Sequence, residues 1–470
     1  MKLPRWVLVA WIALFAPIVA HADVPTLEGA WQGSLQGMMR LVIHIDRSAS
    51  GGLTGKMDSP DQGAMGLPID TLIFANDSLR FTMRRIGGEY VSRRVTRDSL
   101  AGMWRQGGMA LPLGLKRGGT VSLPKRPQEP ARPLAYDTVA VTFPNRRATG
   151  VTIAGTLTVP RGKGPFPCAL LISGSGPEDR DEAVFGHRPF LVLSDHLTRN
   201  GIAVLRVDDR GVGGSTGEFS GATSEDFASD AQASVEFLLT RKEIDRGHIG
   251  LIGHSEGGLI APMVATRTRD VAFIVLMAGP GIPGDSTLIL QSAAMRRSIG
   301  VAPAATDAEA VVVRRMYAKV EAGDSLGAVA EAREVVRMQI AGLSEGQRAA
   351  IGDPDSAAVG AIRRLYTPWM RFFLAFDPRP TLQQVKVPVL AINGEKDLQV
   401  LPKENLAAIQ AAFTAGGNRN ATVKELPGLN HLFQRCTACT LAEYPLLEET
   451  IAPSALDEMT RWIRTHTTTR

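Results

Sequence analysis

The pentapeptide Gly253-His254-Ser255-Glu256-Gly257 has the spacing G-x-S-x-G, and its central hydroxyl could attack a carbonyl carbon. An apolar run, 249–252, precedes it, and a run compatible with a helix, 258–265, follows it. A strand, a sharp turn and a helix form the context in which such a serine is exposed on a strained turn. A side chain at either glycine would collide with neighbouring backbone in that turn. We therefore predict that Ser255 is a nucleophile, and the alternative is a purely structural turn.

A serine hydroxyl is a weak nucleophile at neutral pH, so it needs a base that a carboxylate orients. In a sheet of this kind the base follows the nucleophile in the chain. Two of the eight histidines do so, His431 and His466. His466 stands in a polar tail, whereas His431 closely follows a predicted strand, 422–426. We favour His431 as the base.

The orienting carboxylate is expected where the strand before the histidine ends. The segment Asn393-Gly-Glu-Lys-Asp397 follows the apolar run 387–392, so Glu395 and Asp397 are both candidates. A short turn would place Asp397 beyond the turn and facing the loop of His431. We prefer Asp397 for this role, and we interpret Glu395 as a carboxylate on the surface of the turn.

Acyl transfer also needs backbone N–H donors that stabilise an oxyanion. One donor is expected from Glu256, the residue after the nucleophile, at the positive end of the helix that begins there. The second is expected in the glycine-rich segment 173–177, where Ser175 is our choice and Gly176 its rival. The alternative for this segment is a plain glycine-rich turn. This chemistry requires no metal and no organic cofactor.

The elements that position these residues follow from the pattern beyond residue 137. Short apolar runs alternate there with amphipathic stretches, which predicts a mostly parallel sheet with helices on both faces. An antiparallel pair, 139–142 with 151–159, opens the domain, and a capping box of Thr223 and Asp226 starts one of its helices. The predicted buried strands are 168–173, 202–207, 249–252, 273–277 and 387–393.

More than a hundred residues separate the last two of these strands, which is far more than one crossover needs. Residues of about 285–375 read as several helices and predict a helical cap over the carboxyl edge of the sheet. Thr306, with Glu309 three residues later, predicts the start of one helix, Gly323 its end, and Asp324 the cap of the next. A cap of this kind favours an enclosed pocket of limited volume and therefore a short acyl chain.

The chain before residue 137 has a different composition. Residues 27–118 contain short β-rich runs separated by Gly, Asp, Asn and Ser clusters, without helical periodicity. They predict a small β-barrel or sandwich domain within 23–123, and the proline-rich stretch that follows predicts a linker, 124–136. Residues 1–22 have a basic start, an apolar run and the small-x-small pattern Ala20-His21-Ala22, as in a signal peptide cleaved before Asp23.

The alternative for residues 1–22 is an uncleaved membrane anchor, but their apolar run is shorter than a spanning helix needs. We expect an exported protein, periplasmic or secreted, without stable membrane insertion. Of 470 residues, 44% are hydrophobic and 21% charged, which is typical of a globular chain. The net charge of +5 is too diffuse to predict nucleic-acid binding. In an oxidising compartment, Cys436 and Cys439 are expected to bond to each other and Cys168, in a buried strand, to stay free.

Five motifs in this order resemble the α/β-hydrolase superfamily, and within it a group of exported bacterial carboxylesterases related to α/β-hydrolases classed as serine peptidases. The motifs begin at Ser173, Asp208, Gly253, Asn393 and Gly428. The resemblance covers about 135–470 and implies an α/β-hydrolase domain, 137–470, with a Ser255–His431–Asp397 triad that hydrolyses small carboxylic esters. The β domain resembles a leading module of some exported hydrolases, which carries no known chemistry over.

Other interpretations remain open in the sequence. The first is a serine exopeptidase or aminopeptidase with the same triad, although the leading domain is too short for a β-propeller. The second is a binding protein on an inactive hydrolase scaffold. Among weaker signals, Arg210 is expected to pair with a carboxylate, the acidic run 178–182 to be solvated or paired with arginine, and the phenylalanines of 372–376 to line an acyl pocket or pack a core.

Overall fold

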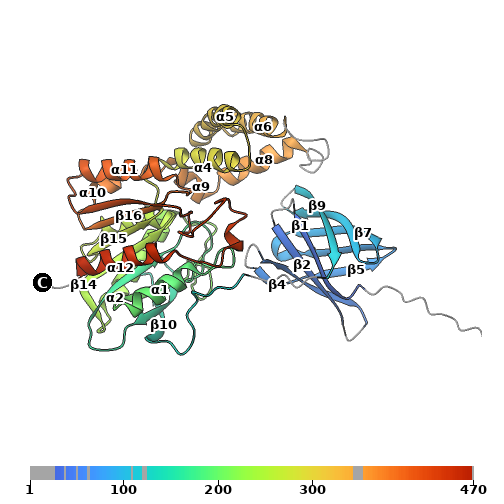
Figure 1. Ribbon diagram of the computed structural model, residues 1–470. Helices are drawn as coiled ribbons and strands as arrows, with labels where there is room; N and C mark the ends of the chain where they lie inside the picture. Colours follow the sequence, from blue (N-terminus) through green and yellow to red (C-terminus); the bar gives the residue numbers. More distant parts are fainter. Residues whose placement is uncertain are drawn as a thin grey trace, which may run out of the picture.

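The computed structural model describes residues 27–467, except for 36–38, 49–50, 61–63, 107–108, 119–123 and 342–352. The predicted signal peptide, 1–22, lies outside the described residues. In the described part of the chain, no helix is both long and apolar enough to cross a membrane. The chain forms an N-terminal β sheet, a larger α/β body and a group of helices at one end of that body (Figure 1).

The described N-terminal residues form one antiparallel sheet in the order β4-β3-β2-β1-β9-β8-β7-β6-β5. Its strands are β1 (Gly29–Leu35), β2 (Met39–Arg47), β3 (Leu53–Ser59), β4 (Ala64–Pro68), β5 (Thr71–Ala75), β6 (Ser78–Met83), β7 (Gly88–Thr96), β8 (Ser99–Gln106) and β9 (Met109–Arg117). A 3-10 turn, η2 (Arg84–Ile86), joins β6 to β7. The prediction of an all-β domain is confirmed.

This sheet curves around its own core as a half-barrel, and it does not split into the two layers of a sandwich (Figure 1). Trp31, Phe81, Tyr90 and Trp104 are buried on its concave side. The polar atoms of these buried aromatic side chains form hydrogen bonds. The Trp31 indole N–H, for example, donates to the Leu27 carbonyl at 2.8 Å. Along β6, buried side chains alternate with more exposed ones. This is expected of a sheet that packs a core on one face and meets solvent on the other.

The segment 124–136 contains neither helix nor strand, yet it is bonded to the α/β body. The Arg126 guanidinium donates to the carbonyl oxygens of Gly186 and Pro445, each at 2.9 Å. The Gln128 amide donates to the Ile451 carbonyl at 2.7 Å. The predicted linker is therefore fixed along the surface of the second domain.

The α/β body contains a sheet in the order β10-β11-β13-β12-β14-β15-β16-β17. Its strands are β10 (Asp137–Pro144), β11 (Thr152–Val159), β12 (Phe166–Ile172), β13 (Ala203–Val207), β14 (Ile244–His254), β15 (Phe273–Met277), β16 (Val389–Gly394) and β17 (Ala421–Leu426). The pairs β10–β11 and β11–β13 are antiparallel, as predicted for the opening pair, and all later pairs are parallel. The predicted fold class is confirmed.

Helices cover both faces of this sheet and bury its apolar strands. On one face pack α2 (Ser224–Leu239), α3 (Glu256–Ala265), α10 (Arg379–Gln384) and α11 (Pro402–Ala415). On the other pack α1 (Pro189–Arg199) and α12 (Pro453–Thr467). A second 3-10 turn, η3 (Tyr444–Leu446), lies in the loop before α12. Strands buried on both faces explain the continuous apolar runs in the sequence.

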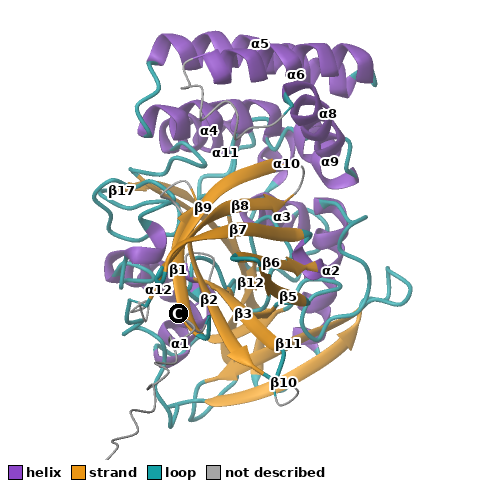
Figure 2. Cartoon of the chain, turned by 90° about the vertical axis from the view of Figure 1, so that its right-hand side faces the viewer, coloured by secondary structure: helices purple, strands orange, loops and turns teal. Residues whose placement is uncertain are grey.

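Between β15 and β16 the chain forms a separate group of helices with its own apolar core. They are α4 (Gly284–Ser298), α5 (Pro303–Glu321), α6 (Ser325–Ala341), α8 (Pro354–Leu365) and α9 (Pro368–Ala375). Figure 2 shows these helices above both sheets, at one end of the molecule. The described helices span 284–375, close to the range predicted for the cap.

Helix starts follow the local signals in two of three cases. Thr223 and Asp226 form the predicted capping box at α2. Asp324 accepts the Gly327 N–H at 2.8 Å, as expected of the residue before α6. The prediction that α5 starts at Thr306 is wrong: this helix begins at Pro303, and the Thr306 hydroxyl donates to the Pro303 carbonyl inside its first turn. A proline at the first helical position sets the start because it lacks an N–H that would be unsatisfied there.

Candidate active site

The turn between β14 and α3 holds Ser255 in a strained conformation, with φ 52° and ψ −116°. The flanking glycines have the steric role expected for them. A Cβ on Gly253 would lie 2.0 Å from the Gly257 carbonyl oxygen, and a Cβ on Gly257 would lie 2.1 Å from that of Ile172. No side chain fits either space. The backbone N–H of Ser255 donates to the Met277 carbonyl on β15 at 2.8 Å, which fixes the turn to the sheet.

The predicted base and acid are in contact. His431 Nδ1 lies 2.7 Å from Asp397 Oδ2, and both side chains are buried. The other carboxylate oxygen of Asp397 accepts the backbone N–H groups of Gln399 at 2.7 Å and Val400 at 3.0 Å. Both oxygens of Asp397 are therefore occupied, so its position and that of the imidazole are fixed.

The rival acid, Glu395, points elsewhere. Its carboxylate is exposed and accepts the Gly428 N–H and the Lys396 ammonium, each at 2.9 Å. These contacts hold its pKa below the ordinary value, with the Lys396 hydrogen bond the larger cause. The structure brings Asp397, and not Glu395, to the histidine. His466 lies in α12, where its ring stacks on Trp462.

The loop of His431 lies against the nucleophile turn. The rings of His431 and His254, the neighbour of Ser255, have centroids 4.8 Å apart, and His254 Nε2 donates to the His431 carbonyl at 3.1 Å. In the described part of the chain, the Ser255 hydroxyl and His431 Nε2 have no hydrogen-bond partner. The serine–histidine hydrogen bond is therefore not formed here, and such bonds often tighten only in the complex with substrate.

The glycine-rich loop after β12 approaches Ser255 from the other side. A Cβ on Gly174 would lie 3.4 Å from the Cβ of Ser255. The Gly174 N–H already donates to Glu182. The N–H groups of Ser175, Gly176 and Glu256 have no acceptor within the described residues, so they are the donors left for an oxyanion.

A contact that sequence reasoning missed links these loops. His254 Nδ1 donates to Glu182 Oε1 at 2.8 Å, and the same oxygen accepts the Gly174 N–H at 2.9 Å. Burial lowers the pKa of His254, but the charge and hydrogen bond of Glu182 outweigh it, so this pKa is raised above its ordinary value. Both ring nitrogens face acceptors, which fits an imidazolium. His254 therefore connects the glycine-rich loop 173–177, which we call the oxyanion loop, to the loop of His431.

The other weak signals have structural roles. Arg210 forms the expected ion pair, with Nε 2.7 Å from Asp230 Oδ2. Within the acidic run, Asp181 pairs with Arg206 as expected, whereas the expectation of a solvated or arginine-paired side chain was wrong for Glu182. The described residues contain no group of three His, Cys, Asp or Glu side chains that could hold a metal ion.

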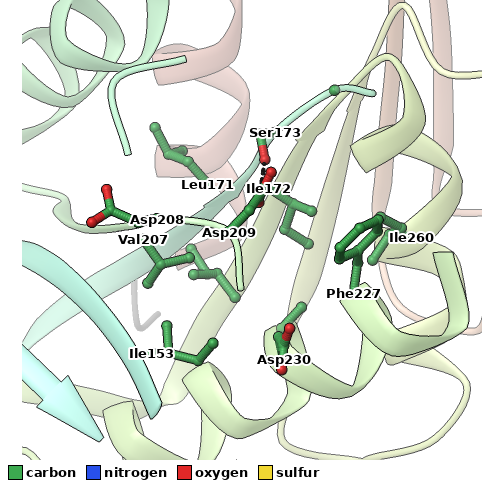
Figure 3. Close-up of a pocket in the computed structure, with 13 residues that line it drawn as sticks. Ile153, Leu171, Ile172, Ser173, Val207, Asp208, Asp209, Phe227, Asp230 and Ile260 are labelled. Carbon is green, nitrogen blue, oxygen red and sulfur yellow. Dashed lines mark hydrogen bonds between the residues drawn. The ribbon is translucent and has the colours of Figure 1, made fainter. Parts of the chain in front are cut away.

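A small cavity lies beside the oxyanion loop; in Figure 3, Phe227 and Ile260 lie on one side of the view and Ile153 and Val207 on the other, with Ser173 and Asp209 between them. The Ser173 hydroxyl donates to Asp209 at 3.0 Å, and burial raises the pKa of Asp209 to about 7. The cavity measures about 30 Å³, room for about one or two water molecules. It is a packing void of the sheet and too small for a substrate.

Comparison with known proteins places this geometry in a family. A family model described as X-Pro dipeptidyl-peptidase (S15 family) matches residues 149–423, which is more than half of the chain. The chain belongs to this family. It is therefore a hydrolase of the α/β-hydrolase superfamily, as the resemblance implied.

Relatives of this S15-family chain include enzymes named as esterases. Esterase EstD of Thermotoga maritima is 25% identical over 322 residues, which are 68% of this chain and 68% of that protein. Among solved structures, the esterase Pf2001 of Pyrococcus furiosus is 16% identical over 74% of this chain and 99% of its own, with a TM-score of 0.42. Est1E of Butyrivibrio proteoclasticus, solved with ferulic acid, is 16% identical over 67% and 94%, with a TM-score of 0.37.

The disulfide expected in this S15-family chain is present. Cys436 and Cys439 are bonded to each other, and Cys168 is a free, buried thiol. The bridge closes a short loop that begins after the four residues that follow His431, and the backbone N–H of Cys439 donates to Glu443. By the loop-entropy relation, closing so short a loop adds only about 2 kcal/mol to the free energy of unfolding. Its main effect is therefore local, on the loop that carries His431.

Glu256 attaches the cap to the nucleophile turn. Glu256 Oε1 accepts the Trp369 indole N–H of α9 at 2.8 Å and the Ser224 hydroxyl at 2.5 Å. Trp369 stacks on Phe373, with ring centroids 5.3 Å apart. Phe373 is buried in the core of the α/β body, and Phe372 and Phe376 pack against that core. Of the two interpretations of these phenylalanines, the structure supports core packing.

Replacing His254 with glutamine is expected to lower kcat about 10–100-fold, with little change in KM. The substitution removes hydrogen bonds between charged groups, each worth about 1.5–3 kcal/mol, that position the two loops around Ser255. Steady-state kinetics on an ester substrate measures the effect. His248→Gln is the matched control, because His248 pairs with Asp245 on the same strand, away from the turn. An equal effect of both variants would refute the positioning role of His254.

Replacing Glu256 with glutamine is expected to change how stability depends on pH. Burial raises the pKa of Glu256 from 4.5 to about 7, so the folded chain keeps a proton there that the unfolded chain loses. Between pH 4.5 and 7 the native state binds more protons, and stability must fall as pH rises. Across that window the wild type should lose on the order of 3 kcal/mol relative to Glu256→Gln.

Urea unfolding of both proteins at pH 5, 6, 7 and 8 measures this difference. Glu225→Gln is the control, because Glu225 is an exposed partner of Arg267. Parallel pH profiles for the wild type and Glu256→Gln would show that Glu256 is ionised throughout, against the expectation.

Proposed function

We propose that this chain is a serine carboxylesterase that hydrolyses short-chain carboxylic esters through an acyl-enzyme on Ser255. The observation that carries the proposal is the buried His431–Asp397 pair, 2.7 Å apart, beside a serine in a strained turn with free N–H donors around it. Names of relatives such as EstD support the ester as substrate. The leader-like residues 1–22 support an exported, periplasmic or secreted enzyme.

In the first step, His431 Nε2 removes the proton of Ser255 as its oxygen attacks the ester carbonyl. The resulting oxyanion accepts the Glu256 N–H and that of Ser175 or Gly176. His431 then gives its proton to the leaving alcohol. In the second step His431 activates a water molecule that cleaves the acyl-enzyme. Asp397 holds the imidazole in the required tautomer and stabilises it when it is charged.

The cap supports a short acyl group. Its Trp369 side chain donates a hydrogen bond to Glu256, the residue directly after the nucleophile, so the cap is held against the nucleophile turn. A cap fixed there by this hydrogen bond and by stacking of Trp369 on Phe373 favours an enclosed site that limits the length of acyl chain. Palmitate esters should therefore be poor substrates, and acetate to hexanoate esters good ones.

An aminopeptidase is the second candidate, and one side chain favours it. Glu178 lies beside the oxyanion loop: a Cβ on Gly176 would lie 3.4 Å from its Oε1. A carboxylate there could bind the α-amino group of a peptide, and the family description names a peptidase. Burial, with smaller effects from Glu182 and Asp209, raises the pKa of Glu178 to about 8. At neutral pH this group is mostly protonated and so a weak ligand for an ammonium ion, which favours the esterase.

Values of kcat/KM for p-nitrophenyl esters and for aminoacyl p-nitroanilides decide between the two. We expect the best ester to exceed the best anilide, and each added methylene to raise kcat/KM about fourfold until the pocket is full. The Ser255→Ala variant measures the background hydrolysis of each substrate. An anilide that outperforms every ester, and that is lost in Glu178→Gln, would establish the peptidase. A maximum at palmitate would contradict the short acyl pocket.

A further inference from the structure

The N-terminal half-barrel contains a cavity of about 430 Å³, far from the triad in the chain. Its walls come from β1, β2, β3, β4, β8, β9 and η2, and are mainly apolar: Met39, Leu41, Met57, Leu67 and Trp104 contribute to them. A volume of this size lies within the range of small-molecule sites, and barrels of this width can hold one ligand.

The polar side chains among the described wall residues offer few hydrogen bonds to water. The Trp104 indole donates to Gln106 Oε1 at 3.1 Å, and the Gln106 amide donates to the Ile86 carbonyl at 2.9 Å. The cavity has room for on the order of ten water molecules, and each would need two to four polar partners. Displacing such water by an apolar body is favourable. Methionines suit this role because their flexible side chains adapt to different shapes.

Among the described residues that line the cavity, Arg85 carries the one charged side chain. In the turn η2, Arg84 is engaged: its backbone N–H and its Nε donate to Asp70 at 2.6 and 3.1 Å. Its neighbour Arg85 lines the cavity and forms no ion pair or hydrogen bond with any described residue. A guanidinium beside an apolar cavity complements a carboxylate, which it binds with two parallel hydrogen bonds.

We propose that the half-barrel binds one acyl-chain carboxylate, with its head at Arg85 and its chain among Met39, Met57 and Trp104. The proposal rests on the cavity and on Arg85 at its wall, and it does not depend on the activity at Ser255. It gives the β domain a function of its own, the binding of an amphiphilic anion. A free fatty acid and an intact ester can carry the same hydrocarbon chain. They differ in the head group, which is a charged carboxylate in the acid and uncharged in the ester.

Isothermal titration of the full chain carrying Ser255→Ala, which removes turnover of the probes, tests the proposal. The probes are decanoate below its micelle concentration, methyl decanoate and decyltrimethylammonium. We expect one decanoate per chain, weaker binding of the uncharged ester, and none of the cation. Arg85→Gln should weaken decanoate binding about 10–100-fold and leave the ester unchanged, since one charge-assisted contact is lost.

Two further variants separate this result from general damage. Arg84→Gln, one residue away and engaged with Asp70, should bind decanoate as the parent does. Leu67→Trp, which fills a half-buried part of the wall, should weaken decanoate and its ester alike. Thermal unfolding of each variant is measured first, to confirm that its Tm is like that of the parent. Absence of saturable decanoate binding, or equal losses in Arg84→Gln and Arg85→Gln, would overturn the proposal.

Discussion

Replacing Ser255 with alanine should lower kcat for ester hydrolysis about 10⁵–10⁶-fold and leave Tm nearly unchanged. The reaction loses the atom that forms the covalent bond, so neither the base nor the oxyanion donors can act. The fold loses little, because the Ser255 hydroxyl has no partner within the described residues, and the strained φ of 52° is the same for alanine. Steady-state kinetics and thermal unfolding on the same preparations measure both quantities.

The matched control for this substitution is Ser175→Ala. Ser175 is an exposed serine of the oxyanion loop, and its proposed contribution is a backbone N–H that alanine retains. Its kcat should therefore stay within about threefold of the wild type. Residual activity of Ser255→Ala above about 1% would show that another group attacks the ester.

Replacing Asp397 with asparagine should lower kcat about 10⁴-fold. The Asp397 carboxylate accepts His431 Nδ1–H through one oxygen and two backbone N–H groups through the other. An amide cannot accept at both positions. If its oxygen keeps the backbone donors, its NH₂ group faces Nδ1 and favours the wrong tautomer of His431.

Glu395→Gln is the control for the acid, two residues away on the same turn. Its side chain accepts from Gly428 and Lys396 at the surface, so kcat should change less than about twofold. Reversed effects, with Glu395→Gln inactive and Asp397→Asn active, would contradict the assignment of the acid. Circular dichroism of both variants checks that the loop of His431 still folds.

Local sterics explain why the nucleophile turn could be predicted from the sequence. Gly253 and Gly257 stand where a Cβ would fall within 2.1 Å of backbone oxygen, so the motif encodes its own geometry. The contact between Asp397 and His431 was predictable for a related reason. Both follow short parallel strands, and parallel strands bring the residues after their carboxyl ends to one edge of the sheet.

Contacts between distant segments could not be predicted in the same way. His254 and Glu182 are 72 residues apart, and nothing in the pattern around either pairs them. One signal was present: a histidine that ends a strand buried on both faces must itself be buried and needs a partner for each nitrogen. The attachment of Trp369 to Glu256, 113 residues away, left no such signal.

The β domain illustrates the same limit at the level of topology. Short β-rich runs separated by turn residues predicted its strands, but a barrel and a sandwich share that pattern. The half-barrel depends on the pairing of β1 with β9, in which Trp31 lies opposite Arg117. This pairing joins the two ends of the domain, and the local pattern does not encode it. The cavity that Arg85 lines lies within the sheet that this pairing holds together.

The most direct test of a Ser255 acyl-enzyme is covalent labelling with a fluorophosphonate, followed by intact mass and peptide mapping. We predict one adduct per chain, located on Ser255, with ester turnover lost in proportion to labelling and no adduct on Ser255→Ala. An active protein that stays unlabelled, or that carries its adduct on a different serine, would contradict the account.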